Sequence, residues 1–202
     1  MLADSKLFSM LARQLYFRAI ELSKITYFES PGRENTDATL QIAKDYAEKG
    51  GVRSVVVAST TGYTAQKAAE VLKDFSLIIV THVSSFREPN QQEFPSDLRD
   101  RLEAEGVRVL TTAHAFNGVS KLADKGSIGQ IIRDTLRMFC EGMKVAAEIT
   151  AMAADAGLVR TDEEVVSVAG TGRGADTALV IRPAISKRLF GMRIERILAK
   201  PV

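Results

Sequence analysis

Val55-Val56-Val57-Ala58-Ser59-Thr60-Thr61-Gly62-Tyr63-Thr64-Ala65 is the most informative stretch of this 202-residue sequence. Three β-branched residues, followed by small hydroxyl residues and a glycine, predict a buried strand, a tight turn and the start of a helix. Free backbone N–H groups and hydroxyls at a helix N-terminus form an anion site. The alternative is that Thr60 or Thr61 only caps its own helix. We favour a ligand, because one cap needs one hydroxyl and this turn offers four: Ser59, Thr60, Thr61 and Thr64.

Strand and helix patterns alternate on both sides of this stretch. We expect strands at 25–28, 55–58, 77–81, 107–111, 165–169, 178–181 and 194–198, and helices at 35–49, 63–73, 95–106, 128–139 and 143–156. Alternation of this kind predicts an α/β fold, a three-layer α/β/α sandwich with a mostly parallel sheet and helices on both faces. We assign residues 24–202 to one such domain.

Residues 1–23 stand apart from this alternation. Leu7, Leu11, Leu15 and Leu22 fall near one face of a helix, and charged residues occupy other positions. We therefore expect an N-terminal amphipathic helix that docks on its own domain or on a neighbouring subunit. An apolar stripe of this length favours a homo-oligomer.

The composition of the chain indicates which partners and which cell compartment to expect. The chain has 27 basic and 25 acidic residues and no run of Lys or Arg, which argues against a nucleic-acid or anionic-membrane partner. Its apolar runs are too short to span a membrane. The single cysteine, Cys140, is expected to be a buried structural thiol, and a chain with one cysteine is typical of a cytoplasmic protein. Two histidines and one cysteine are too few for a zinc-like ligand cluster.

Polar and glycine residues follow several of the expected strands. In a parallel sheet, ligands bind at the carboxyl ends of the strands. The candidates there are Gly32, Arg33, Asn35 and Thr36 after the first strand, Ser59 to Thr64 after the second, His82 after the third, and His114, Asn117 and Gly118 after the fourth. A lone histidine is more often structural than a ligand, and two at equivalent positions leave both interpretations open.

A second loop candidate is Gly170-Thr171-Gly172-Arg173-Gly174-Ala175-Asp176-Thr177. Its glycine spacing matches the dinucleotide fingerprint, but that fingerprint needs a helix next, and a strand pattern follows here. Alternate glycines still allow backbone amides to converge on an anion, and Arg173 adds a planar donor. The alternative is a plain turn between two strands. We favour a ligand loop because it contains Arg173 and Asp176.

The chain resembles the standalone pyruvate kinase C-terminal-domain-like proteins of archaea and some bacteria. The match rests on Pro31–Thr36, Ser59–Ala65, Glu148–Gly157 and Arg173–Ala184, and it does not cover the first 22 residues. The resemblance implies a pyruvate kinase C-terminal-domain-like fold with no barrel domain and no pyruvate kinase activity. It also implies a phosphate-bearing ligand, flavin mononucleotide (FMN), with Ser59, Thr60, Thr61, Gly62 and Thr64 corresponding to the effector phosphate turn.

Two classes of function remain open on the sequence. One is a binding module for FMN, serving as a sensor or carrier; the other is a small FMN-dependent oxidoreductase with His82 or His114 as proton donor. A phosphosugar or nucleotide effector module would use the same phosphate turn. For FMN, the ribityl candidates are Arg33, Asn35, Asn117 and Asp176, and the ring candidates are His82, His114, Phe116 and Met152. We favour the binding module, because we find no nucleophile motif, metal cluster or diagnostic carboxylate pair.

Overall fold

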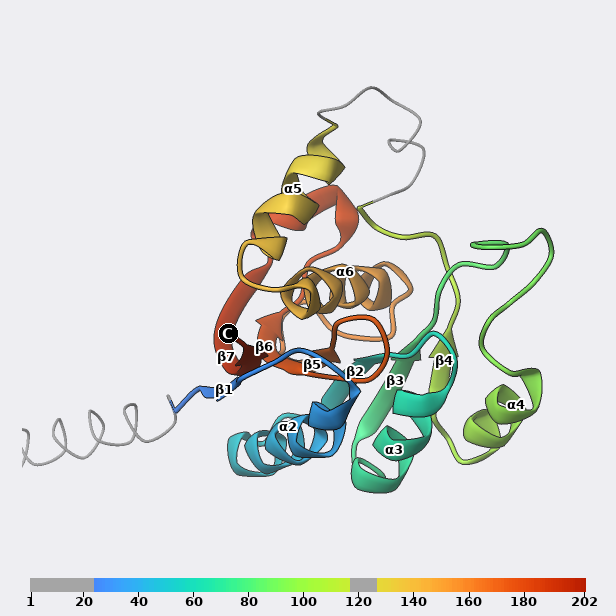
Figure 1. Ribbon diagram of the computed structural model, residues 1–202, viewed down its shortest axis with the longest axis horizontal. Helices are drawn as coiled ribbons and strands as arrows, with labels where there is room; N and C mark the ends of the chain where they lie inside the picture. Colours follow the sequence, from blue (N-terminus) through green and yellow to red (C-terminus); the bar gives the residue numbers. More distant parts are fainter. Residues whose placement is uncertain (1–23, 117–126) are drawn as a thin grey trace, which may run out of the picture.

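The structure is a computed structural model that describes residues 24–116 and 127–202, and Figure 1 shows the order of its elements. The expected N-terminal helix and two site candidates, Asn117 and Gly118, lie outside the described residues. The strands are β1 (Thr26–Phe28), β2 (Ser54–Ala58), β3 (Ser76–Val80), β4 (Arg108–Leu110), β5 (Val165–Ala169), β6 (Thr177–Arg182) and β7 (Arg193–Pro201). The helices are η1 (Arg33–Asn35), α2 (Thr36–Gly50), α3 (Tyr63–Val71), α4 (Ser96–Ala104), α5 (Ile128–Arg137), α6 (Glu141–Asp155) and η3 (Ser186–Gly191).

The strands form one seven-stranded sheet in the order β1-β7-β6-β5-β2-β3-β4. Among the described strands, β6 alone runs against the others, because it pairs antiparallel with both β5 and β7 while the remaining pairs are parallel. The expectation of a mostly parallel sheet is confirmed. The antiparallel β6 follows from its short connection to β5, since a parallel neighbour would need a longer crossover.

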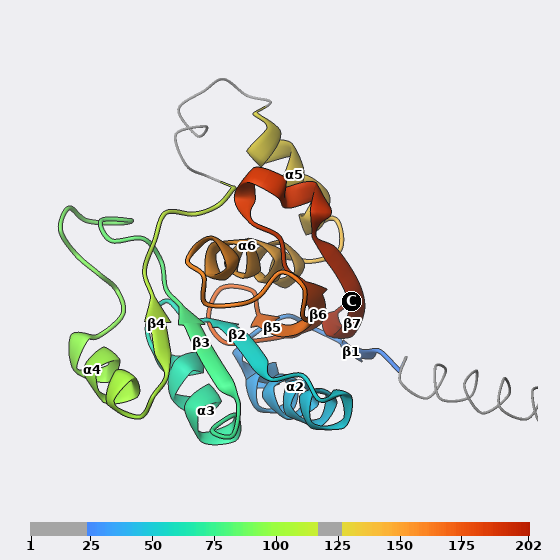
Figure 2. The same cartoon turned by 180° about the vertical axis from the view of Figure 1, so that it is seen from behind.

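Helices cover both faces of the sheet, as Figures 1 and 2 show: α2, α3 and α4 lie on one face, and α6 lies on the other with α5 beyond it. Each face has its own apolar core. Leu40, Val57, Leu72, Ile79 and Leu102 belong to the first core. Val56, Ile78, Met152, Leu179 and Ile181 belong to the second. Adjacent residues such as Val56 and Val57 serve opposite cores because side chains alternate along a strand.

The common strand direction places one set of loops at a single edge of the sheet. The segments that follow β1, β2, β3, β4 and β5 all begin at this carboxyl edge, and β6 starts from it. The expected ends of the elements agree with the structure to within a few residues. Helix α6 starts earlier than expected, because the half-buried Cys140 caps it by accepting a hydrogen bond from Met143 N–H at 3.3 Å.

Helix α5 differs from the other described α-helices in having no buried residue. Ile128, Ile131, Met138 and Phe139, within or just after it, are exposed, and so is Phe190 of η3. The two segments lie beside each other in both views of the fold (Figures 1 and 2). Within the described ranges, no helix is long and apolar enough to cross a membrane.

Candidate functional site

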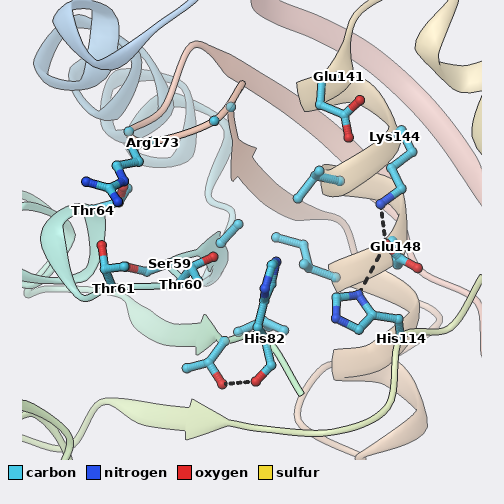
Figure 3. A pocket seen from close by; sticks show the side chains of 18 of the residues that line it. Ser59, Thr60, Thr61, Thr64, His82, His114, Glu141, Lys144, Glu148 and Arg173 are labelled. Atoms are coloured by element: carbon cyan, nitrogen blue, oxygen red, sulfur yellow. Dashed lines mark hydrogen bonds and ion pairs between the residues drawn. The ribbon is translucent and has the colours of Figure 1, made fainter. Parts of the chain in front are cut away.

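A pocket of about 490 Å³ opens at the carboxyl edge of the sheet. Its volume lies in the usual range for small-molecule sites. One side is formed by the segments after β1, β2 and β5, and the other by α5, α6 and the segments after β3 and β4. Figure 3 shows these two sides, with Ser59, Thr60, Thr61, Thr64 and Arg173 on one and Lys144, Glu148 and His114 on the other.

The turn after β2 lines the pocket with hydroxyl groups. Ser59 is buried, and its Oγ accepts a hydrogen bond from Ala65 N–H at 3.2 Å, so it caps the third residue of α3. Neither Thr60 nor Thr61 caps the helix, and Thr61 is exposed. The other amides of this first turn have no partner within the helix. The Ser59 cap therefore leaves hydroxyls and amides of this turn available to a ligand.

Gly62 explains why the chain can turn so sharply before α3. Its φ of 90° is one that side-chain-bearing residues rarely adopt. A Cβ at this position would also collide with the Leu98 side chain of α4. Gly62 therefore shapes the turn without lining the pocket.

The glycine-rich loop after β5 is tied to the loop after β1. The fully buried Asp176 carboxylate accepts hydrogen bonds from Gly32 N–H at 3.1 Å and from Thr171 N–H at 3.0 Å. Thr36 makes a second link, because its Oγ1 accepts from Ala175 N–H at 3.0 Å and donates to the carbonyl of Arg33 at 2.7 Å. These buried polar groups hold the two loops in one fixed relation.

Two arginines reach the pocket from these joined loops, Arg33 and Arg173. The guanidinium of Arg33 lies 3.5 Å from the ring centroid of Tyr63, in the first turn of α3. Stacking on an aromatic face holds a guanidinium while leaving its edge N–H groups available. In Figure 3, Arg173 lies on the same side as Thr64 and the Ser/Thr turn. Hydroxyls, amides and two guanidinium groups thus meet at this end of the pocket.

The opposite wall contains a buried ion pair on α6. Lys144 Nζ lies 2.7 Å from Glu148 Oε2, and the two side chains are only 8% and 3% exposed. The other oxygen of Glu148 accepts a hydrogen bond from Phe116 N–H at 3.0 Å. Next to this pair, Arg137 bonds Glu141 at 2.6 Å, and Arg133 completes the wall from α5. With Arg33 and Arg173, five cations outnumber the two carboxylates, so the pocket favours an anionic ligand.

Both histidines line this pocket, and each faces a carboxylate. His114 Nδ1 lies 3.7 Å from Glu148 Oε2, and His82 Nδ1 lies 3.4 Å from Glu93 Oε2. The two rings meet edge to face with centroids 5.2 Å apart, and the Phe86 ring lies 4.3 Å from His82 and 5.8 Å from His114. The three rings form an aromatic corner of the pocket.

Glu148 stays ionised in this environment. Its burial would raise the pKa of the carboxyl, but His114, Lys144 and the Phe116 N–H outweigh burial and lower the pKa to about 2. The pKa of His82 is lowered from its ordinary value by burial and then by His114 and Lys144, against an opposing effect of Glu93. His82 is therefore a neutral imidazole at neutral pH.

The structure brings together many of the candidates from the sequence. Those that line the pocket are Arg33, Ser59, Thr60, Thr61, Thr64, His82, His114, Met152, Gly170, Gly172, Arg173 and Gly174. Other candidates lie beside it without lining it: Gly32, Asn35, Thr36, Gly62, Thr171, Ala175, Asp176 and Thr177. Phe116, a candidate for the ring, is buried behind the wall. Asn35 and Asp176, expected to contact a ribityl chain, bond to the protein instead.

Sequence reasoning named Met152 of α6 but missed the charged and aromatic residues on that side of the pocket. The missed residues are Phe86, Glu93, Arg133, Arg137, Glu141, Lys144 and Glu148. One signal was available for α6, because Glu141, Lys144 and Glu148 recur at helical spacing along an otherwise apolar helix. Within residues 24–116 and 127–202, no group of three or more metal-ligating side chains could hold a metal ion.

Comparison with known proteins assigns the family. The family described as "Pyruvate kinase, alpha/beta domain" matches residues 37–181, well over half of the chain. The chain belongs to this family. The match includes the turn after β2, both histidines, α6 and the glycine-rich loop, so every lining residue of the pocket except Arg33 lies within the family region.

Solved structures of pyruvate kinase align with most of this chain. Two crystal structures of pyruvate kinase from Cryptosporidium parvum each align with 73% of the chain at 13% identity, with TM-scores of 0.39 and 0.40. A third, of the C. parvum enzyme in complex with ADP, aligns with 71% at 14% identity and a TM-score of 0.40. The alignments cover 22% of each of these chains, so this sequence spans about a fifth of their length.

Proposed function

We propose that the chain binds a phosphate-bearing small molecule in this pocket and that the ligand is FMN. The observation that carries the proposal is the division of one pocket into two chemically different ends. The Ser59–Thr64 turn, Arg33 and Arg173 offer donors to a phosphate, as a helix N-terminus with flanking arginines does elsewhere.

The other end has the properties that a flat heterocycle needs. His82, Phe86 and His114 supply ring faces and edges, and Ile149 and Met152 supply apolar contact. Aromatic and apolar walls with a few polar groups are typical of ligand sites. Two buried nitrogens here, His114 Nε2 and Arg133 Nε, have no hydrogen-bond partner among the described residues, so the residues present fit a ring with polar edges.

The terminal phosphate would then lie at the Ser/Thr turn, and the isoalloxazine ring would lie toward α6. When bound, FMN supplies electron-transfer chemistry. The protein residues supply binding, orientation and electrostatics. The FMN assignment itself comes from the family resemblance, since a phosphosugar would satisfy the turn equally well.

A direct experiment is to purify the protein without added ligand, denature it, and examine the supernatant by fluorescence and mass spectrometry. We expect FMN. Titration of the ligand-free protein with FMN and with riboflavin then tests the role of the phosphate. FMN should bind more tightly by roughly 10- to 100-fold, because riboflavin lacks the charge-assisted hydrogen bonds. A phosphosugar in the supernatant, together with no uptake of FMN, would refute FMN and leave a phosphate-effector module.

A catalytic role has one specific observation in its favour. Two imidazoles, each with a carboxylate beside it, face the part of the pocket assigned to the ring. Such pairs act as general acids and bases in many enzymes. Proton exchange by His82 or His114 would make the protein a small FMN-dependent oxidoreductase. Reduction of bound FMN by candidate electron donors, followed by its absorbance, distinguishes this role from a carrier.

A further inference from the structure

The pair Lys144 and Glu148 requires an explanation beyond stability. Burying two charges costs desolvation energy that their attraction often does not fully offset, and an apolar pair of similar size is often at least as stabilising. The pair lies among the buried, mostly apolar residues of α6, at the pocket wall. Buried charged groups in a cleft are candidates for a functional role.

One consequence of the pair is a fixed arrangement around His114. The Glu148 carboxylate is held by Lys144 Nζ at 2.7 Å and by Phe116 N–H at 3.0 Å, and it faces His114 Nδ1 at 3.7 Å. An ionised carboxylate beside Nδ1 favours the tautomer with the proton on that nitrogen. In that neutral tautomer the other ring nitrogen, Nε2, carries a lone pair and is an acceptor.

The acceptor Nε2 of His114 has a donor counterpart in Arg133. Both Nε2 and Arg133 Nε are buried, and neither has a hydrogen-bond partner in residues 24–116 or 127–202. Both residues line the same pocket. The two are also anchored to the same backbone segment, since Arg133 Nη1 donates to the carbonyl of Phe116 at 3.5 Å. Leaving buried polar atoms unpaired is costly, so a ligand that pairs them gains affinity.

We propose that His114 Nε2 and Arg133 Nε form an acceptor–donor pair that selects a ligand ring with an imide edge, an N–H flanked by carbonyl groups. The ring N–H would donate to His114, and an adjacent carbonyl would accept from Arg133. Lys144 and Glu148 act as positioning residues, because they keep His114 in the accepting tautomer. The proposal rests on the proposed function, since the phosphate at the Ser59–Thr64 turn orients the ring toward this wall.

Figure 3 shows where His114 lies in the pocket. His114 lies between Glu148 and His82, on the side of the pocket away from Thr61 and Arg173. The neighbouring His82 also has a carboxylate beside Nδ1, that of Glu93, but its Nε2 is not among the buried atoms that lack a partner, whereas the Nε2 of His114 is. Flavins and uracil nucleotides carry an imide edge, whereas adenine and phosphosugars do not.

The test compares ligands that differ only at the imide. The ligand-free full chain is titrated with FMN and with N3-methyl-FMN by flavin fluorescence or calorimetry. Methylation removes the N–H and leaves Nε2 unpaired, so we expect affinity to fall by roughly 5- to 150-fold. Equal affinities for the two flavins would overturn the proposal.

Matched variants distinguish loss of the His114–Arg133 pair from general damage to the pocket. In His114→Phe the discrimination between the two flavins should disappear, whereas His82→Phe should retain it. Arg133→Lys keeps the positive charge but lacks the Nε–H, so it should weaken FMN binding about as much as Arg133→Met. Full discrimination in His114→Phe, or FMN binding in Arg133→Lys equal to wild type, would contradict the assignment.

A second pair of ligands tests the imide pair if FMN does not bind. If FMN does not bind, uridine monophosphate and its N3-methyl derivative are compared in the same assay. Discrimination between those two nucleotides would support the imide pair and refute FMN. No discrimination with either pair of ligands would refute the imide pair, whatever else the Ser59–Thr64 turn binds.

Discussion

Gly174 should be irreplaceable for a reason that its neighbour Gly172 does not share. It has a φ of 96°, and a Cβ built on it would lie 2.6 Å from Arg33 Cα and 2.7 Å from Thr36 Oγ1. The first of these is a backbone atom, so a side-chain rotation cannot relieve the clash. Gly174→Ala should cost about 1–2 kcal/mol for the positive φ and about 1–3 kcal/mol more for overpacking.

Gly172→Ala is the matched control. Its φ is 70°, and an added Cβ would have no heavy atom within 4 Å, so only the backbone penalty applies. Urea unfolding of both variants measures the difference, which we expect to be about 1–3 kcal/mol, or roughly 1 M in the midpoint at ordinary m-values. Folded Gly174→Ala should also bind FMN more weakly, because Arg33 is displaced. Equal midpoints for the two variants would show that the loops separate freely, and would refute the rigid junction described above.

Three further predictions concern the turn, the buried carboxylate and the N-terminus. Thr61→Ala should weaken FMN binding by roughly 10-fold and leave the stability unchanged. Ser59→Ala should weaken FMN binding and also lose about 1 kcal/mol of stability, because its cap on Ala65 disappears. Calorimetry measures the binding, and urea unfolding measures the stability. Glu148 has a pKa lowered from 4.5 to about 2, so it contributes about 3 kcal/mol above pH 4.5 that is lost as the pH falls toward 2. The stability gap between wild type and Glu148→Gln should therefore narrow over that range in pH-dependent unfolding, and a constant gap would contradict the assignment. We propose that residues 1–22 assemble the chain into a homo-oligomer, so a truncation starting at residue 23 should stay folded but elute later on a sizing column; unchanged assembly would refute this.

The secondary structure was predictable wherever the signal is local. The Val55–Ala65 stretch predicted β2, its turn and α3, because β-branched residues, glycine and small polar residues constrain the backbone at their own positions. The strand after the glycine-rich loop was also predictable, which excluded a dinucleotide fold at that loop. The predicted start of α6, at residue 143, was two residues late, because the cysteine that caps it is not a common capping residue.

The candidate site was predictable on one side only. Loops at the carboxyl edge can be inferred from the alternation of strands and helices, which predicts a parallel sheet, so Arg33, the Ser/Thr turn and Arg173 were named as candidates. Asn35 and Asp176 have the chemistry of ligand contacts, but their hydrogen bonds go to the protein. A polar residue in a loop has the same sequence signature in both cases, and only the position of its partner distinguishes them.

The sequence alone determined the α/β alternation, the family and the strand–turn–helix at Val55–Ala65, since each depends on residues that are neighbours along the chain. Only the tertiary structure decided which wall faces that turn. Lys144 and Glu148 look like an ordinary helix pair in the sequence. They become part of a site because α6 crosses the sheet beside the loop that carries His114. Burial, tautomer and pKa depend on such distant neighbours, and the free energy of a buried charge depends on every group packed against it.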